Sequence, residues 1–162
     1  MPLSVFGLLL WAGVLLAFHA TSGWVPLLDS ANLAFHEAGH PLFGMVAAKL
    51  MVYGGTLMQL LMPAACWFEM MREEKFTGAY FCAIWFAESL LNVARYMADA
   101  RAKQLPLVGG LDPNDSHDWS YIFNNWGVIQ YDTAIADGVR LLAVLLMGWA
   151  IFSAWRRARE YS

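Results

Sequence analysis

Long apolar segments divide the chain, and they constrain its fold more than any other feature. Residues 3–20 contain no Asp, Glu, Lys or Arg, and a helix of about that length can cross the hydrocarbon of a bilayer. The 162 residues are 59% hydrophobic and 14% charged, whereas soluble domains are about 45–50% apolar and about 25% charged. We therefore predict an all-α, polytopic membrane protein with a single integral membrane domain over residues 1–162.

The apolar pattern predicts four to five transmembrane or embedded helices. The expected helices are residues 3–20, 31–49, 56–71, 77–102 and 133–155, with an outer loop at 104–132. Asp29 to Asn32 offer N-caps for the second helix, and Tyr53-Gly54-Gly55 is expected to break the chain before the third. Pro63 is expected to kink that third helix. Residues 3–20 lack a basic flank and a good cleavage site, so we interpret them as a retained helix rather than a signal peptide.

The distribution of Lys and Arg predicts the orientation in the membrane. Arg72 and Lys75 mark one short turn and three arginines mark residues 156–159, and such clusters favour the cytoplasm. The loop 104–132 is then outside, and we expect a bacterial inner membrane. The segment 31–49 is a weak span with Pro41 inside it, and it suits an interfacial or re-entrant helix that shares the outer side with the loop.

Charge and cysteine content exclude other classes of protein. The formal net charge of −3 is too small and of the wrong sign for nucleic-acid binding by bulk attraction. Cys66 and Cys82 lie in apolar runs without CxxC spacing, which favours buried thiols over a disulfide or a metal knuckle.

The most specific motif is the HExxH box formed by His36, Glu37, Ala38, Gly39 and His40. Positions i and i+4 of a helix lie one turn apart on the same face, so both imidazoles can reach one metal ion. The intervening glutamate can then take a proton from a water molecule at that metal. We therefore predict a Zn²⁺ site with His36 and His40 as ligands and Glu37 as the catalytic general base.

A zinc site of this kind needs a third protein ligand and leaves the fourth position open. We predict His117 as that ligand, because it lies in the outer loop beside a carboxylate. Asp99 and Asp112 are the alternatives, and Glu88 is a deeper one. Asp118 is expected to orient a neighbouring imidazole rather than to bind the metal itself.

The helix expected at 77–102 carries a polar stripe. Glu88, Asn92, Arg95 and Asp99 recur at i, i+4, i+7 and i+11, and in a membrane such a stripe should face the interior of the bundle. It is either an ion-paired packing seam, in which Arg95 pairs with Glu88 or Asp99, or part of a functional site. Gln59 is expected to join it.

The box resembles that of the membrane-embedded zinc metalloproteases of the site-2 protease type. Residues 54–59, Gly-Gly-Thr-Leu-Met-Gln, are similar to the glycine-led third core helix of that family, with Gln59 where the family has Asn. Leu111-Asp112-Pro113 is similar to their Leu-Asp-Gly motif, although Pro replaces Gly. The resemblance implies zinc held by His36 and His40. The box and the His-Asp-Trp loop also resemble those of a small uncharacterised bacterial membrane family.

These features predict a membrane-embedded, zinc-dependent metallopeptidase that hydrolyses peptide bonds of membrane-associated substrates. Its expected partners are the lipid bilayer and a membrane-protein or peptide substrate, with no nucleic acid. The alternative is a non-catalytic membrane subunit of a larger complex, in which a metal or an ion-paired site only fixes the structure.

Overall fold

The computed structural model describes residues 2–108, 112 and 116–160, and this part of the chain contains helices and no strand. The predicted all-α fold class is confirmed. The elements, in chain order, are α1 (Leu3–Thr21), α2 (Leu28–Val46), the 3-10 helix η1 (Ala48–Leu50), α3 (Met51–Arg72), α4 (Phe76–Ala98), α6 (Asp118–Asn125), the 3-10 helix η3 (Ile129–Tyr131) and α7 (Asp132–Glu160).

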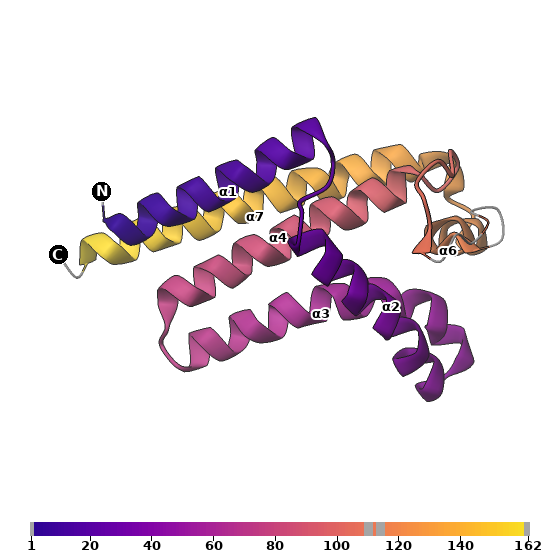
Figure 1. Cartoon of the computed structure of the whole chain (residues 1–162), viewed down its shortest axis with the longest axis horizontal. Coiled ribbons are helices and arrows are strands. Elements are labelled where there is room, and N and C mark those ends of the chain that lie inside the picture. The colour runs from indigo at the N-terminus through magenta and orange to yellow at the C-terminus, as the bar shows by residue number, and fades with distance from the viewer. Residues whose placement is uncertain (1, 109–111, 113–115, 161–162) are drawn as a thin grey trace.

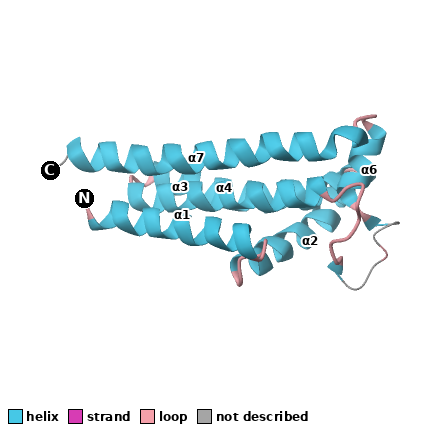
Figure 2. Cartoon of the chain, turned by 90° about the horizontal axis from the view of Figure 1, so that it is seen from above, coloured by secondary structure: helices cyan, strands magenta, loops and turns pink. Residues whose placement is uncertain are grey.

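The central helix is α4, which packs on α3 on one side and on α7 on the other, while α1 contacts α4 and α7 (Figures 1 and 2). Both termini and the turn between α3 and α4 lie at one end of the bundle, and α6 lies at the opposite end (Figure 1). The helix α2 crosses α3 obliquely near the α6 end. This arrangement brings the HExxH helix toward the segment that follows α4.

Three helices are long and apolar enough to cross a membrane by length and composition. They are Leu3–Thr21, Ala48–Arg72 and Ile129–Glu160. The helix α4, which carries Glu88, Asn92 and Arg95, lies outside that set. The chain therefore has the helices of an integral membrane protein, while the full number of four to five transmembrane or embedded helices stays a prediction.

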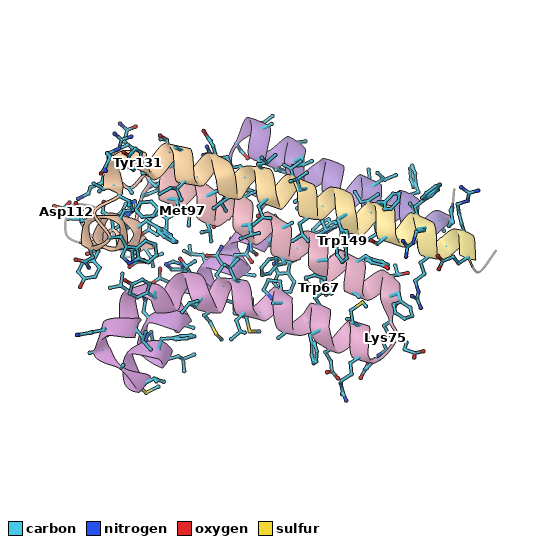
Figure 3. All side chains as sticks on the ribbon, turned by 180° about the vertical axis from the view of Figure 1, so that it is seen from behind. Trp67, Lys75, Met97, Asp112, Tyr131 and Trp149 are labelled. Carbon is cyan, nitrogen blue, oxygen red and sulfur yellow. The ribbon has the colours of Figure 1, made fainter. Side chains whose placement is uncertain are left out.

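The interface between α4 and α7 is built from small residues. Ala79, Ala83 and Ala87 of α4 and Ala143 and Ala150 of α7 are each fully buried. Small side chains let helix backbones approach closely, which is how helices associate in lipid. Trp149 of α7 also packs on α3, where its ring lies 5.6 Å from that of Trp67 between centroids (Figure 3).

The helix α2 is polar on its buried face and apolar on its exposed face. Its buried residues are Asp29, Asn32, His36 and Gly39. Its exposed apolar side chains include Leu42, Met45 and Val46, with exposed fractions of 45%, 77% and 78%. A helix on the surface of a soluble domain has the opposite pattern. The inverted pattern suits a helix whose outer face meets lipid.

The predicted break at Tyr53-Gly54-Gly55 is wrong, because α3 begins at Met51 and both glycines lie inside it. They serve close packing instead. A Cβ on Gly39 of α2 would lie 2.1 Å from the carbonyl oxygen of Gly54, and a Cβ on Gly54 would lie 2.5 Å from that of Gly39. The two backbones are therefore in direct contact, at a distance that only glycine permits.

Other boundaries also differ from the prediction. The helix α2 begins at Leu28, so Asp29 lies inside it, and its carboxylate accepts a hydrogen bond from the Val25 main-chain N–H at 2.6 Å. The predicted outer loop contains α6 and η3, since His117 accepts from the Ser120 N–H and caps a short helix. The last helix continues beyond residue 155 to Glu160.

We expect Gly39→Ala to destabilise the protein, because the added methyl group collides with the α3 backbone rather than with a flexible side chain. Overpacking of this kind costs about 1–3 kcal/mol, visible as a lower midpoint of thermal unfolding in detergent. Gly7→Ala in α1 is the matched control, since nothing lies within 4 Å of a Cβ at that position. Equal midpoints for the two variants would contradict the close α2–α3 contact.

Candidate metal centre

Three side chains converge between α2 and the start of α6. Asp118 Oδ2 lies 3.0 Å from His36 Nε2 and 3.5 Å from His40 Nε2. One ligand atom from each of these residues lies within 4.8 Å of the other two. Among the described residues, this group of His36, His40 and Asp118 can hold a metal ion.

The second nitrogen of each histidine faces an acceptor. His36 Nδ1 lies 3.3 Å from Gln59 Oε1, and His40 Nδ1 lies 2.9 Å from the carbonyl oxygen of Met51. A carbonyl oxygen can only accept, so each Nδ1 carries a proton and donates it. The Nε2 atoms then face Asp118, which is the orientation that metal-binding histidines adopt.

The orientation of Gln59 is itself fixed. Its Nε2 donates to Asn92 Oδ1 of α4 at 3.0 Å, which leaves Oε1 toward His36. The prediction that Gln59 joins the polar stripe of α4 is confirmed by this bond. A chain of hydrogen bonds therefore runs from α4 through α3 to the first histidine of the box.

The spacing of the three ligand atoms fits a metal ion. Metal–ligand bonds of about 2.0–2.1 Å in a tetrahedron place neighbouring ligand atoms about 3.3 Å apart, and the distances to Asp118 Oδ2 are 3.0 and 3.5 Å. A metal ion at this point could take one lone pair from each of the two Nε2 atoms and from Asp118 Oδ2. The donor set is therefore one that suits a cation at its centre.

Glu37 lies beside this group in a cavity of about 650 Å³. The cavity is lined on one side by Leu33, Glu37 and the two box histidines, and on another by residues 105–108. Arg95 is the one Lys or Arg among its lining residues. The site thus combines a group that could hold a metal ion, a carboxylate outside that group and a cavity beside both.

Asp118 is placed by α6 and α4. It is the first residue of α6, and its main-chain N–H donates to the Tyr96 hydroxyl at 3.1 Å. The Tyr96 ring lies 5.9 Å from that of His36 and 4.3 Å from that of His117, between centroids. The Tyr96 ring therefore lies near both imidazoles, and its hydroxyl fixes the main chain at Asp118.

Among the described residues, the predicted third ligands are not part of the triad. His117 is buried, its Nδ1 accepts from the Ser120 N–H, and its Nε2 lies 3.4 Å from Asp99 Oδ2. Burial lowers the pKa of His117 below its ordinary value, although Asp99 raises it in part. Asp99 accepts from the main-chain N–H groups of residues 104 and 105. Asp112 is exposed, and its neighbours Leu111 and Pro113 lie outside the described residues.

The polar stripe of α4 faces the interior, but its partners differ from those expected. Arg95 donates to the carbonyl oxygen of Gly23 rather than to Glu88 or Asp99. Glu88 lies against His19 and Asn32 instead. The stripe therefore ties α4 to the other helices instead of pairing within itself.

From the sequence, Asp118 was expected only to orient a neighbouring imidazole, whereas in the structure it lies against both box histidines. Neighbouring residues at a helix start point in different directions, and spacing alone does not show which of His117 and Asp118 faces α2. The one signal in the sequence is the helical pattern that begins after residue 117. It indicates that His117 caps the helix, and a capping side chain is held by the first turn and is less free to bind a metal. Comparison with protein-family models, curated proteins and solved structures gave no match for this chain.

We expect His36→Ala, His40→Ala and Asp118→Ala each to lose bound metal, because each removes one of the three ligands. His117→Asn should keep it, since Asn retains an acceptor for the α6 cap while losing the Nε2 atom. Elemental analysis of the purified variants, with Asp112→Ala as a second control, measures this directly. Metal loss in His117→Asn with retention in Asp118→Ala would reverse the assignment.

We also expect Gln59→Met to weaken metal binding, because the hydrogen bond that fixes the His36 tautomer is lost while the side chain keeps a similar length. Loss of a side chain that hydrogen-bonds a metal-binding histidine weakens metal affinity by about 10–100-fold. Competition with a metal-sensitive dye measures the change in Kd. Thr56→Val, another buried polar position of α3, is the control and should leave the Kd unchanged.

Proposed function

We propose that this chain is a membrane-embedded, zinc-dependent metallopeptidase that cleaves membrane-associated peptide segments. The single observation that carries the proposal is the convergence of His36, His40 and Asp118 on one point, with Glu37 in the same cavity. Two histidines from an HExxH box and one carboxylate leave a fourth position open, as catalytic zinc sites do.

Zinc is the metal we propose, on the chemistry of the ligands. Two neutral imidazoles and one carboxylate suit Zn²⁺ in a four-coordinate site, whereas Ca²⁺ and Mg²⁺ prefer oxygen ligands. The charge also balances, because one divalent ion offsets Asp118 and Glu37 together. Arg95 then leaves the cavity with a net positive charge.

The residues of the cavity supply the remaining chemistry. When bound, zinc lowers the pKa of a coordinated water toward about 7 and polarises a carbonyl group. Glu37 accepts the proton of the attacking water on its carboxylate and delivers it to the leaving amine nitrogen. Gln59 and the Met51 carbonyl hold the imidazoles, and Tyr96 holds Asp118, so the ligands do not have to reorganise during the reaction.

The walls of the cavity favour an extended apolar substrate. Leu33, Leu105, Leu107 and Val108 line it together with Trp24, so apolar side chains can be buried there. A helical segment hides its carbonyl groups in its own hydrogen bonds, so a substrate has to unwind before it reaches Glu37. The three long apolar helices keep the site at the membrane, where such segments are found.

We expect Glu37→Gln to retain zinc and to lose peptide cleavage by about 10²–10⁴-fold, because the amide keeps the shape of the side chain and cannot accept the proton. The assay is mass spectrometry of a defined library of apolar peptides in detergent with the zinc-loaded protein. Glu73→Gln, in the exposed turn after α3, is the matched control and should cleave at the wild-type rate.

Turnover by Glu37→Gln equal to that of the wild type would refute the role of the base. A wild-type protein that binds one zinc ion per chain and cleaves none of the library would favour the non-catalytic membrane subunit. Absence of bound metal in the wild type after reconstitution would refute both the zinc site and the enzyme.

A further inference from the structure

A second cluster of buried polar groups lies where α1, α2 and α4 meet. Asp29 of α2 and Glu88 of α4 are both 0% exposed. The side chain of His19, near the end of α1, is 12% exposed. Asn32 completes the cluster, one turn after Asp29 on the same face of α2. Neither the metal centre nor the proposed reaction uses these residues.

The contacts of the cluster leave one acceptor without a donor. Glu88 Oε1 lies 3.1 Å from His19 Nε2, and Glu88 Oε2 accepts from Asn32 Nδ2 at 2.8 Å. Asp29 Oδ2 accepts from the Val25 N–H at 2.6 Å. Asp29 Oδ1 is buried without a hydrogen-bond partner, and the Asp29 carboxyl lies within hydrogen-bonding reach of Glu88.

Two carboxylates cannot both stay ionised in this place. Buried charges have to be paired, and like charges at hydrogen-bonding distance disfavour the doubly ionised state. The basic side chain in contact with them is His19 of α1, and Arg95 of α4 lies near His19. Arg95 donates to the Gly23 carbonyl oxygen, and a charged His19 offsets only one carboxylate. One further positive charge is needed.

A proton supplies that charge better than a metal ion. Among the described residues, the His, Cys, Asp and Glu atoms that converge closely enough to share a metal ion are those of the triad at the metal centre. The atoms of the cluster around Glu88 do not converge in this way. A proton on Asp29 Oδ1 gives the orphaned oxygen a donor role and gives Glu88 a third hydrogen bond.

We propose that Asp29 and Glu88 form a buried proton-binding site, in which one proton lies between Asp29 Oδ1 and the Glu88 carboxylate and exchanges with the surroundings through His19. His19 is the partly exposed member of the cluster, and its Nε2 is in reach of Glu88 Oε1. Starting from two ionised carboxylates, a protonated His19 passes its Nε2 proton to Glu88, and the proton then settles on Asp29 Oδ1. His19 takes up a second proton from the surroundings, which leaves it charged and paired with the ionised Glu88.

Infrared spectroscopy of the full-length protein in detergent tests this site. The wild type at neutral pH should show the C=O stretch of a protonated carboxyl group, and that band should shift in D₂O. Asp29→Asn should lose the band, because the remaining Glu88 is paired with His19. Asp137→Asn, which removes an exposed carboxylate paired with Arg140, is the matched control and should keep it.

Substitution of His19 tests the exchange path. His19→Gln should slow the response of the band to D₂O, because the titratable link to the surface is gone. An unchanged exchange rate would refute the role of His19.

Three further results would overturn the site itself. They are a wild-type spectrum without a protonated carboxyl band at neutral pH, a band that persists in both Asp29→Asn and Glu88→Gln, and a band abolished by NaCl or LiCl at constant pH. The last would identify a bound alkali cation in place of the proton. The wild-type spectrum alone can refute the site even if the variants do not fold. None of these readouts depends on bound zinc or on peptide cleavage, so the proton site and the proposed function can fail separately.

Discussion

The contact between the backbones of α2 and α3 is the constraint on which the candidate site depends. Gly39 lies inside the HExxH box, and its carbonyl oxygen is too close to Gly54 to admit any side chain there. A Cβ on Gly55 would lie 2.6 Å from His36 Nε2, so the imidazole rests directly on the α3 backbone. The same approach brings the Met51 carbonyl and Gln59 within reach of the two histidines. The glycines therefore set the direction in which both Nε2 atoms point.

The buried face of α2 is polar, which is unusual for a helix in a folded protein. It contributes Asp29, Asn32 and His36 to the interior while its apolar residues remain exposed. In water such a helix would gain little from packing, because none of its fully buried residues has an apolar side chain. In an apolar environment the polar groups gain by meeting one another, since lipid offers them no hydrogen bonds. The polar stripe of α4 supplies partners through Glu88, which accepts from Asn32, and through Asn92, which accepts from Gln59 beside His36.

Much of this arrangement follows from local sequence pattern. The i, i+4 spacing of the box predicted that His36 and His40 share a face, and both do lie against Asp118. The period of the α4 stripe predicted an inward polar face, and Gln59 was correctly expected to join it. Gly54 and Gly55 were misinterpreted as a break, because glycine in a helix is unfavourable by local propensity alone. The position of α2 shows why the glycines are there, since its close packing on α3 outweighs the cost of glycine in a helix.

The third member of the candidate metal-binding group could not be predicted from local pattern, and the reason lies in how α6 is built. His117 caps that helix by accepting from the Ser120 N–H, and Ser120 Oγ donates to the Ala100 carbonyl oxygen. Asp99 holds the start of the following segment through two main-chain N–H groups and lies beside His117. These residues carry the side-chain chemistry of metal ligands, yet their positions serve to fix the start of α6 against the end of α4. Asp118 is the first residue past that fixed point, and its carboxylate is therefore the group that reaches the box.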